Sequence, residues 1–119
     1  MDSEKEDTRT ELPRAEAIAR LNDSMRRSGG GGLIVATSGV RALKAFSQLD
    51  LLHALASYDR FDLHNDPHGE RDFGDLELWG TELLWKIDYL DHEMIYGSDD
   101  PADPAQTTRV LTVMLTMEY

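Results

Sequence analysis

Imidazole and carboxylate side chains alternate with other residues in one short segment of the chain. The five are His64, Asp66, His68, Glu70 and Asp72. Together they offer the donors that zinc, manganese or iron accept, and in an extended chain they would share one face. The first four are therefore candidate metal ligands, and a metal-dependent enzyme using the His64–Asp72 loop is one functional hypothesis. Pro67 and Gly69 interrupt an extended segment, and the spacing matches neither His-Glu-x-x-His nor a calcium loop. A solvated loop explains the same residues and is the favoured interpretation.

Negative charge is concentrated in the C-terminal half. The chain carries a net charge of −11, and residues 61–119 hold fourteen Asp and Glu against three Lys and Arg, whereas residues 1–60 hold nine of each. Such a surface repels nucleic-acid phosphates and attracts cations or basic protein surfaces. The residues predicted to contact a partner are Asp66, Glu70, Asp72, Trp79, Asp91, Glu93, Asp99 and Asp100.

Composition excludes several classes of chemistry. The chain has 119 residues and no cysteine, so it is predicted to be one domain without disulfides, thiol catalysis or cysteine-based zinc sites. The glycine run 29–32 is followed by Leu-Ile-Val rather than by the Lys-Ser/Thr of a phosphate-binding loop. No membrane segment and no secretory signal are expected, which fits the cytoplasm. Residues 1–10 are predicted to be an acidic, disordered N-terminus, and residues 11–119 a single α+β domain.

Apolar periodicity divides the first half into helix, strand and helix. Residues 11–28 are predicted to be a helix with Thr10 as its cap and Pro13 in its first turn. Residues 33–37 are typical of a buried strand. Ser38 is expected to cap a short helical turn, and Ser47 to cap a second helix that runs to about Tyr58.

The second half is predicted to contain a hairpin, two acidic loops and a last helix. Residues 62–72 and 90–103 are the loops, and the hairpin spans residues 75–89, with Trp85 and Ile87 in the core. A two-residue turn at Trp79-Gly80 would set Glu77 opposite Glu82, so a four-residue turn is favoured on charge. Trp79 is either an exposed binding anchor or a cover for the core edge. Residues 104–117 are predicted to be a helix capped by Asp103.

Four short motifs resemble a known family. They are Asn65–Gly74, Trp85–Tyr89, Gly97–Pro104 and Thr108–Thr112. This string of motifs resembles a proteobacterial family catalogued as domain of unknown function 3768, over roughly Ile18 to Tyr119. The resemblance implies a bacterial accessory protein, because members of that family often lie on plasmids and other mobile elements. It implies no activity, cofactor or catalytic residue.

The expected fold class is α+β, a small and mainly antiparallel sheet with helices packed on one face and the 75–89 hairpin at its centre. The expected function is non-enzymatic, without a cofactor. It is binding of a basic protein surface through the acidic half, with inhibition of a host nucleic-acid-directed defence system, anti-CRISPR or anti-restriction, as its concrete form. Such a protein would imitate nucleic acid rather than bind it. A structural or regulatory subunit with incidental acidity is a further alternative, and a homodimer stays open.

Overall fold

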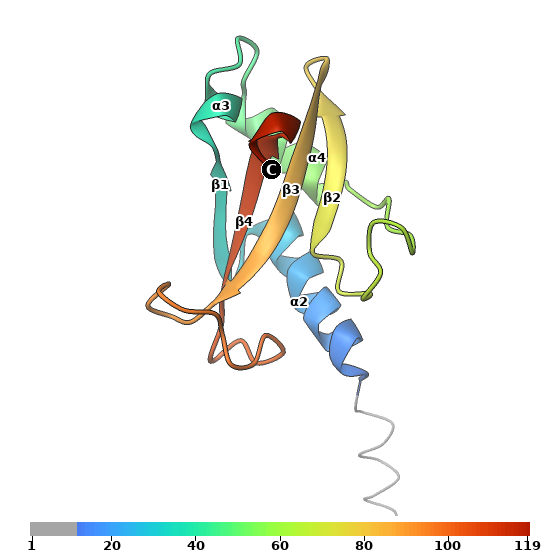
Figure 1. The fold of residues 1–119 in the computed structure, drawn as a ribbon, viewed down its shortest axis with the longest axis vertical. Helices are drawn as coiled ribbons and strands as arrows, with labels where there is room; N and C mark the ends of the chain where they lie inside the picture. Colours follow the sequence, from blue (N-terminus) through green and yellow to red (C-terminus); the bar gives the residue numbers. More distant parts are fainter. Residues whose placement is uncertain (1–11) are drawn as a thin grey trace, which may run out of the picture.

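The computed structural model describes residues 12–119, so the prediction of disorder for residues 1–10 and the predicted cap Thr10 lie outside the described residues. The elements along the chain are α2 (Arg14–Ser28), β1 (Gly32–Ala36), α3 (Ser38–Arg41), α4 (Gln48–Ala56), β2 (Phe73–Leu78), β3 (Thr81–Leu90), β4 (Thr108–Leu115) and the 3-10 turn η1 (Thr116–Glu118) (Figure 1). The predicted α+β class is confirmed.

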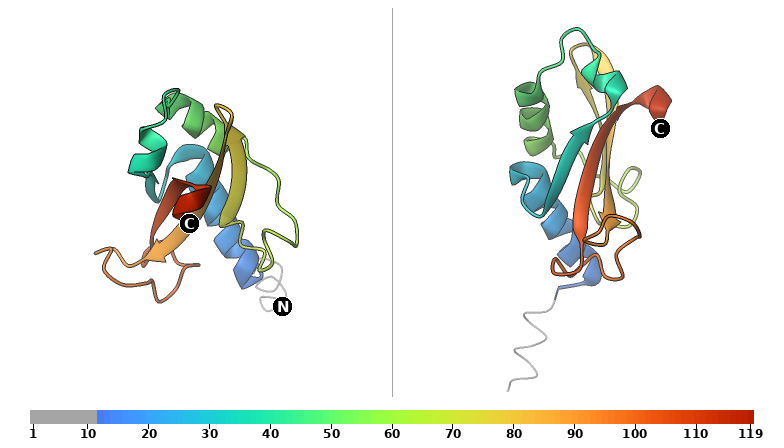
Figure 2. Two further views of the ribbon diagram at one scale, coloured as in Figure 1. Left: turned by 45° about the horizontal axis from the view of Figure 1, so that its top comes forward. Right: turned by 90° about the vertical axis from the view of Figure 1, so that its left-hand side faces the viewer.

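The strands form one four-stranded sheet in the order β1-β4-β3-β2. β1 runs parallel to β4, and the other two pairs are antiparallel. Helices α2 and α4 lie against one face, while no long helix of the described residues covers the other face (Figure 2). The 75–89 hairpin forms one side of the sheet rather than its centre, because β4 lies between β3 and β1.

The core lies between the helices and the sheet. Trp85 and Ile87, predicted to be buried, are 0% and 5% exposed, which confirms both. The indole of Trp85 meets the ring of Tyr58 edge to face at 5.3 Å and the ring of Phe61 at 6.1 Å. Edge-to-face packing adds to the burial of the rings themselves, so Trp85 joins the sheet to the segment that follows α4.

The predicted C-terminal helix 104–117 is wrong, because this part of the chain forms β4 and the turn η1. Arg109, Leu111 and Val113 are buried on the helix side, while Val110 and Thr112 alternate with them and face the other way. β4 has a paired strand on each side, and apolar residues occupy both of its faces. Such a run carries the apolar spacing of a helix as well as that of a strand, and here the β-branched residues fit the strand.

Asp103 makes the local contacts of a cap, although no helix follows it. Its carboxylate accepts hydrogen bonds from the Ala105 amide at 2.9 Å and from Gln106 Nε2 at 2.8 Å. The same contacts close an isolated turn in the loop before β4. Side-chain hydrogen bonds of this kind stabilise turns as well as helix starts. The residue pattern that forms them therefore predicted a helix where only a turn is present.

The predicted four-residue turn of the hairpin is also wrong. Trp79 and Gly80 form a two-residue turn with positive φ at both positions, and Glu77 lies opposite Glu82. Two-residue turns of this hand match the twist of the strands. This register places Gly74 opposite Trp85, and a side chain at Gly74 would collide with the rings of Trp85 and Tyr58. Packing of the buried indole outweighs a repulsion of a few tenths to about 1 kcal/mol between exposed carboxylates.

The ends of the helices agree with the sequence predictions more closely than the last element and the hairpin turn do. The Ser47 side chain accepts from the Asp50 amide, as predicted for the cap of α4, while α3 is capped by Thr37 rather than by Ser38. α2 ends where Gly29 adopts a left-handed conformation with φ of 80°, which glycine adopts without steric cost. None of the helices within residues 12–119 has the length and hydropathy needed to cross a bilayer.

Replacement of the buried indole should test this core. We expect Trp85→Ala to lower the free energy of unfolding by about 3–5 kcal/mol, because it removes a large buried side chain and leaves a cavity. Urea denaturation followed by circular dichroism measures the change. Trp79→Ala is the matched control and should cost less, since Trp79 is only half buried. Equal losses from the two variants would contradict the assignment of Trp85 to the core centre.

Candidate partner-binding site

The eight residues predicted to contact a partner lie in three separate places. Asp66, Glu70 and Asp72 belong to the segment between α4 and β2, and Trp79 lies in the hairpin turn. The other four, Asp91, Glu93, Asp99 and Asp100, belong to the loop between β3 and β4, called here the 91–107 loop.

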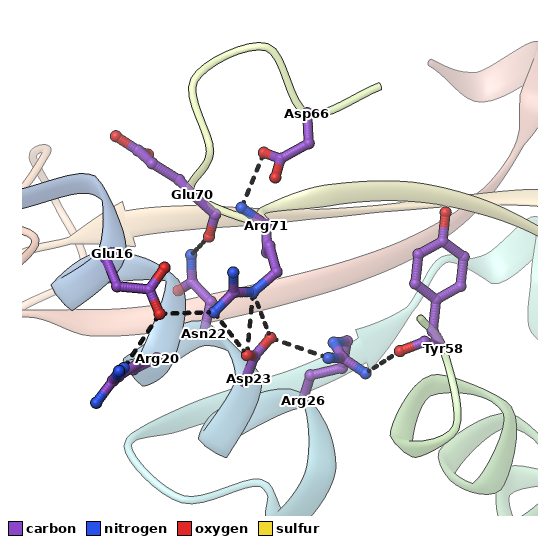
Figure 3. A network of polar contacts seen from close by, with 9 residues as sticks. All are labelled: Glu16, Arg20, Asn22, Asp23, Arg26, Tyr58, Asp66, Glu70 and Arg71. Atoms are coloured by element: carbon purple, nitrogen blue, oxygen red, sulfur yellow. Dashed lines mark hydrogen bonds and ion pairs between the residues drawn. The ribbon is translucent and has the colours of Figure 1, made fainter. Parts of the chain in front are cut away.

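The 62–72 loop is attached to α2 through Arg71. The Arg71 guanidinium pairs with Asp23 at 2.9 Å and with Glu16 at 3.4 Å, both on α2 (Figure 3). The amide of Arg71 donates to the carboxylate of Asp66 at 2.9 Å. Arg71 has a φ of 54°, which is uncommon for a residue with a side chain. Asp66 is thus used within its own loop, where it supports the turn that aims Arg71 at α2.

Glu70 and Asp72 converge on one tyrosine. The hydroxyl oxygen of Tyr89 lies 3.0 Å from Glu70 Oε1 and 3.2 Å from Asp72 Oδ2, and it accepts a hydrogen bond from Asn22 Nδ2 at 2.9 Å. A tyrosine hydroxyl has one proton to donate, so the two carboxylates share a single donor. Burial raises the pKa of Asp72, and the negative charge of Glu70 adds to this effect.

Burial also raises the pKa of Tyr89, so its hydroxyl stays protonated at neutral pH. The guanidinium of Arg109 lies over the Tyr89 ring at 5.2 Å and donates to Asn22 Oδ1 at 2.6 Å. The half-buried carboxylates therefore belong to a polar cluster that joins α2 to β3 and β4. This cluster holds elements together, so Glu70 and Asp72 have contacts of their own within the molecule.

The candidate metal ligands are not gathered into a site. Within residues 12–119, no group of three or more His, Cys, Asp and Glu side chains is placed to hold a metal ion. His64 and His68 are exposed, while Asp66 and Glu70 are engaged in the contacts described above. The turns around Pro67 and Gly69 break the extended conformation that alternation would have required.

Trp79 covers an edge of the core. Its indole nitrogen donates to Asp50 Oδ2 at 3.0 Å, and its ring packs edge to face on Phe46 at 5.8 Å. The side chain is half buried and packs against the core cluster. These contacts favour a cover for the core edge over the other alternative stated for Trp79, an exposed binding anchor.

The 91–107 loop has a shape fixed by its own hydrogen bonds. The Asp91 amide donates to the Tyr96 carbonyl at 2.8 Å, and the Asp91 carboxylate accepts from the Ile95 amide at 3.1 Å. His92 crosses to the other arm, with Nδ1 2.9 Å from Thr108 Oγ1 and Nε2 2.6 Å from the Ala105 carbonyl oxygen. The two arms are thus tied together, and what they present at the surface is held in place.

Asp100 fastens this loop to α2. Its carboxylate pairs with Arg14 at 2.7 Å and accepts from the Ala102 amide at 3.1 Å. Asp91 and Asp100 therefore have internal roles. Glu93 and Asp99 are exposed, and within residues 12–119 neither side chain makes a hydrogen bond or an ion pair. These two carboxylates remain available to a partner.

Apolar side chains stand exposed beside these free carboxylates. Met94, Ile95 and Tyr96 are 47%, 64% and 72% exposed. An open hollow of about 610 Å³ lies next to them, bordered by Tyr96, Glu93 and Asp99 among others. An exposed tyrosine in a polar rim is the usual composition of a binding hot spot. The sequence reasoning missed Ile95 and Tyr96, although three consecutive apolar residues inside an acidic loop were a signal that could have found them.

The comparisons with known proteins identify the family. The model of a family described as a protein of unknown function, DUF3768, matches residues 36–118. Because this match covers well over half of the chain, the protein belongs to the DUF3768 family. The resemblance found in the sequence motifs is thereby confirmed. No curated protein and no solved structure was found to match the chain.

The carboxylate cluster makes a prediction for the pH dependence of stability. A carboxyl group whose folded pKa is raised destabilises the folded state when it is ionised, and this penalty disappears as pH falls through the folded pKa. For Asp72 that pKa lies above the ordinary value of 3.8. We therefore expect Asp72→Asn to raise the melting temperature at pH 7. The difference in melting temperature between this variant and the parent should shrink as the pH falls toward the ordinary pKa of an aspartate.

Melting curves of both proteins between pH 7 and about pH 4 measure this difference. Asp59→Asn is the control, since Asp59 is exposed and far from Tyr89 in the chain, and it should change little at any pH. A constant difference between Asp72→Asn and the parent across this range would contradict the prediction.

Proposed function

We propose that the protein binds a basic protein surface through the exposed part of the 91–107 loop, namely Glu93, Ile95, Tyr96 and Asp99. The observation that carries this proposal is the exposed pair Ile95 and Tyr96 beside two free carboxylates. A partner's apolar pocket would receive the tyrosine, and basic side chains would meet Glu93 and Asp99. Aromatic anchors supply most of the affinity at such interfaces, while rim charges set the encounter rate.

The partner class follows from the charge. The net charge of −11 and its concentration after residue 60 favour a partner with a basic surface. Proteins that act on nucleic acid offer basic grooves of this kind. Inhibition of a host nucleic-acid-directed defence enzyme, anti-CRISPR or anti-restriction, in the bacterial cytoplasm is the concrete form of the proposal. The association of such families with mobile elements supports it.

The contacts of the structure narrow how such an inhibitor would work. Glu70 and Asp72 lie against the Tyr89 hydroxyl, Asp91 accepts from a backbone amide and Asp100 pairs with Arg14, so contacts within the molecule hold these carboxylates in place. Mimicry of a long phosphate backbone is therefore less well supported than a short contact, in which Tyr96 enters an apolar pocket of the partner and the two exposed carboxylates meet the basic side chains around it.

The proposal is tested by comparing capture from a bacterial lysate on three immobilised proteins. The first is the parent chain. The second carries Glu93→Gln, Asp99→Asn and Tyr96→Ala. The third is a control that carries Asp59→Asn and Glu77→Gln, which removes the same charge from exposed positions outside the loop.

We expect proteins retained by the parent and the control to be lost from the loop variant, with affinity for an identified partner falling at least about tenfold. Binding should weaken between about 0.1 M and 1 M salt, as the screening length falls from about 10 Å to about 3 Å. Duplex DNA should compete for the partner. Equal retention by all three proteins would contradict the proposal, and loss from the control alone would also contradict it, because it would move the site to the surface around Asp59 or Glu77.

A further inference from the structure

One edge of the sheet is unprotected. β1 forms a border of the sheet, and its five residues Gly-Leu-Ile-Val-Ala include no charge and no proline. Folded proteins usually guard such an edge with charged residues, proline or a bulge, because its unpaired N–H and C=O groups accept another strand. Within residues 12–119 the sheet ends at β1 on this side, as Figure 1 shows.

The opposite edge is guarded in the ways that β1 lacks. β2 carries Asp75 and Glu77. The outward amide of Asp75 donates to the Tyr58 hydroxyl at 3.3 Å, and its carbonyl accepts from Arg60 at 2.6 Å. Side chains thus occupy the outward amide and carbonyl of Asp75, in the middle of the edge that another strand would use at β2. The contrast makes β1 the edge at which pairing is open.

Two hydrogen bonds show which residues of β1 face outward. The Arg109 amide donates to the Gly31 carbonyl, and the Thr37 amide donates to the Val113 carbonyl. In a parallel pair, every second residue of a strand directs its amide and carbonyl toward the same neighbouring strand. Because Gly31 and Thr37 bond to β4, the backbone groups of the odd-numbered residues of β1 also face β4. The amides and carbonyls of Gly32, Ile34 and Ala36 therefore point to the free edge.

A groove runs beside the same edge on the helix face. It has a volume of about 400 Å³ and is lined by apolar side chains together with the polar Arg41 and Gln48; the apolar residues are Ile34, Val35, Ala36, Phe46, Leu51 and Leu52. On the other face of the sheet, Leu33 and Val35 are 47% and 41% exposed. An added strand would therefore find backbone partners along the edge and apolar surface on both sides, the two components of β-strand addition.

We propose that a second copy of this chain occupies the edge, with the two β1 strands antiparallel about a two-fold axis at Ile34. In this register Ile34 faces Ile34 of the second copy, and Gly32 faces Ala36. All the outward amides and carbonyls then find partners. Leu33 of each copy lies beside Val35 of the other on one face, and the Ile34 side chains meet near the grooves on the opposite face.

Charge complementarity between the two ends of β1 favours a second copy as the occupant. The net charge of −11 makes two chains repel each other overall, but residues 32–36 carry no charge, so the seam itself brings no like charges together. The Gly32 end of β1 adjoins His92 and Met94 of the acidic 91–107 loop, whereas the groove at the Ala36 end includes Arg41. The antiparallel two-fold brings the acidic end of each copy to the end that carries Arg41 in the other.

Sedimentation velocity of the full chain tests the proposal at concentrations from about 1 μM to about 1 mM. We expect the mass to rise from 13.4 kDa toward twice that value as concentration increases. Val35→Lys places a charge on the seam and should raise the dissociation constant at least about tenfold. Leu63→Lys is the matched control, because Leu63 is 87% exposed in a distant loop, and it should dimerise like the parent.

Ile34→Pro is a second variant. It removes an amide that the monomer does not use, and proline is tolerated on an edge strand whose N–H faces solvent, so it should give a folded monomer. Hydrogen exchange of the parent chain is independent of any variant. The Ile34 amide should become protected as concentration rises, while the Val35 amide is protected throughout.

A parent chain that stays monomeric over the whole range would overturn the proposal and leave the edge to an extended peptide of another protein. A dimer that forms equally well with Val35→Lys, or one without protection at Ile34, would place the interface elsewhere and also overturn it.

Discussion

The ion pairs that Asp23 makes with two arginines hold the helices, the 62–72 loop and the sheet in one arrangement. Asp23 pairs with Arg26 at 3.0 Å and with Arg71 at 2.9 Å. Arg26 also donates to the Leu55 carbonyl oxygen at 2.7 Å and to the Tyr58 carbonyl oxygen at 2.9 Å, the second of which is drawn in Figure 3. The side chain of Arg26 is 1% exposed. Removing one partner would leave the other charge buried without compensation. Breaking a buried ion pair in this way lowers the stability of the fold by about 3–5 kcal/mol.

This network of ion pairs and hydrogen bonds decides which acidic residues remain for binding. A carboxylate near α2 or Tyr89 is drawn into the network and fixes an element, as Asp72 does. In the 91–107 loop, Glu93 is exposed and makes no side-chain hydrogen bond or ion pair within residues 12–119, so it can meet a partner directly. Net charge describes the long-range attraction of a basic partner, but the contact itself depends on the few groups left free and on the exposed Tyr96 beside them.

Local patterns in the sequence predicted the elements whose neighbours are close in the chain. Alternation along 75–89, the cap at Ser47 and the glycine after α2 each depend on contacts within a few residues, and the structure has them. The same reasoning failed at residues 104–117. There the cap-like bonds of Asp103 were real, but the strand conformation of β4 depends on β1 and β3, which pair with it from distant parts of the chain.

The sequence by itself determined the α+β class, the buried Trp85, the acidic half and the family, because composition and short-range periodicity carry these directly. Only the tertiary structure decided the hairpin register, since Gly74 must face Trp85 to admit the indole. It also separated Glu70 and Asp72 from Glu93 and Asp99, which look alike in the sequence. Whether a carboxylate is free depends on which donors folding brings to it. The donor for Glu70 and Asp72 is the Tyr89 hydroxyl, which comes from a remote strand and is itself held by Asn22 of α2.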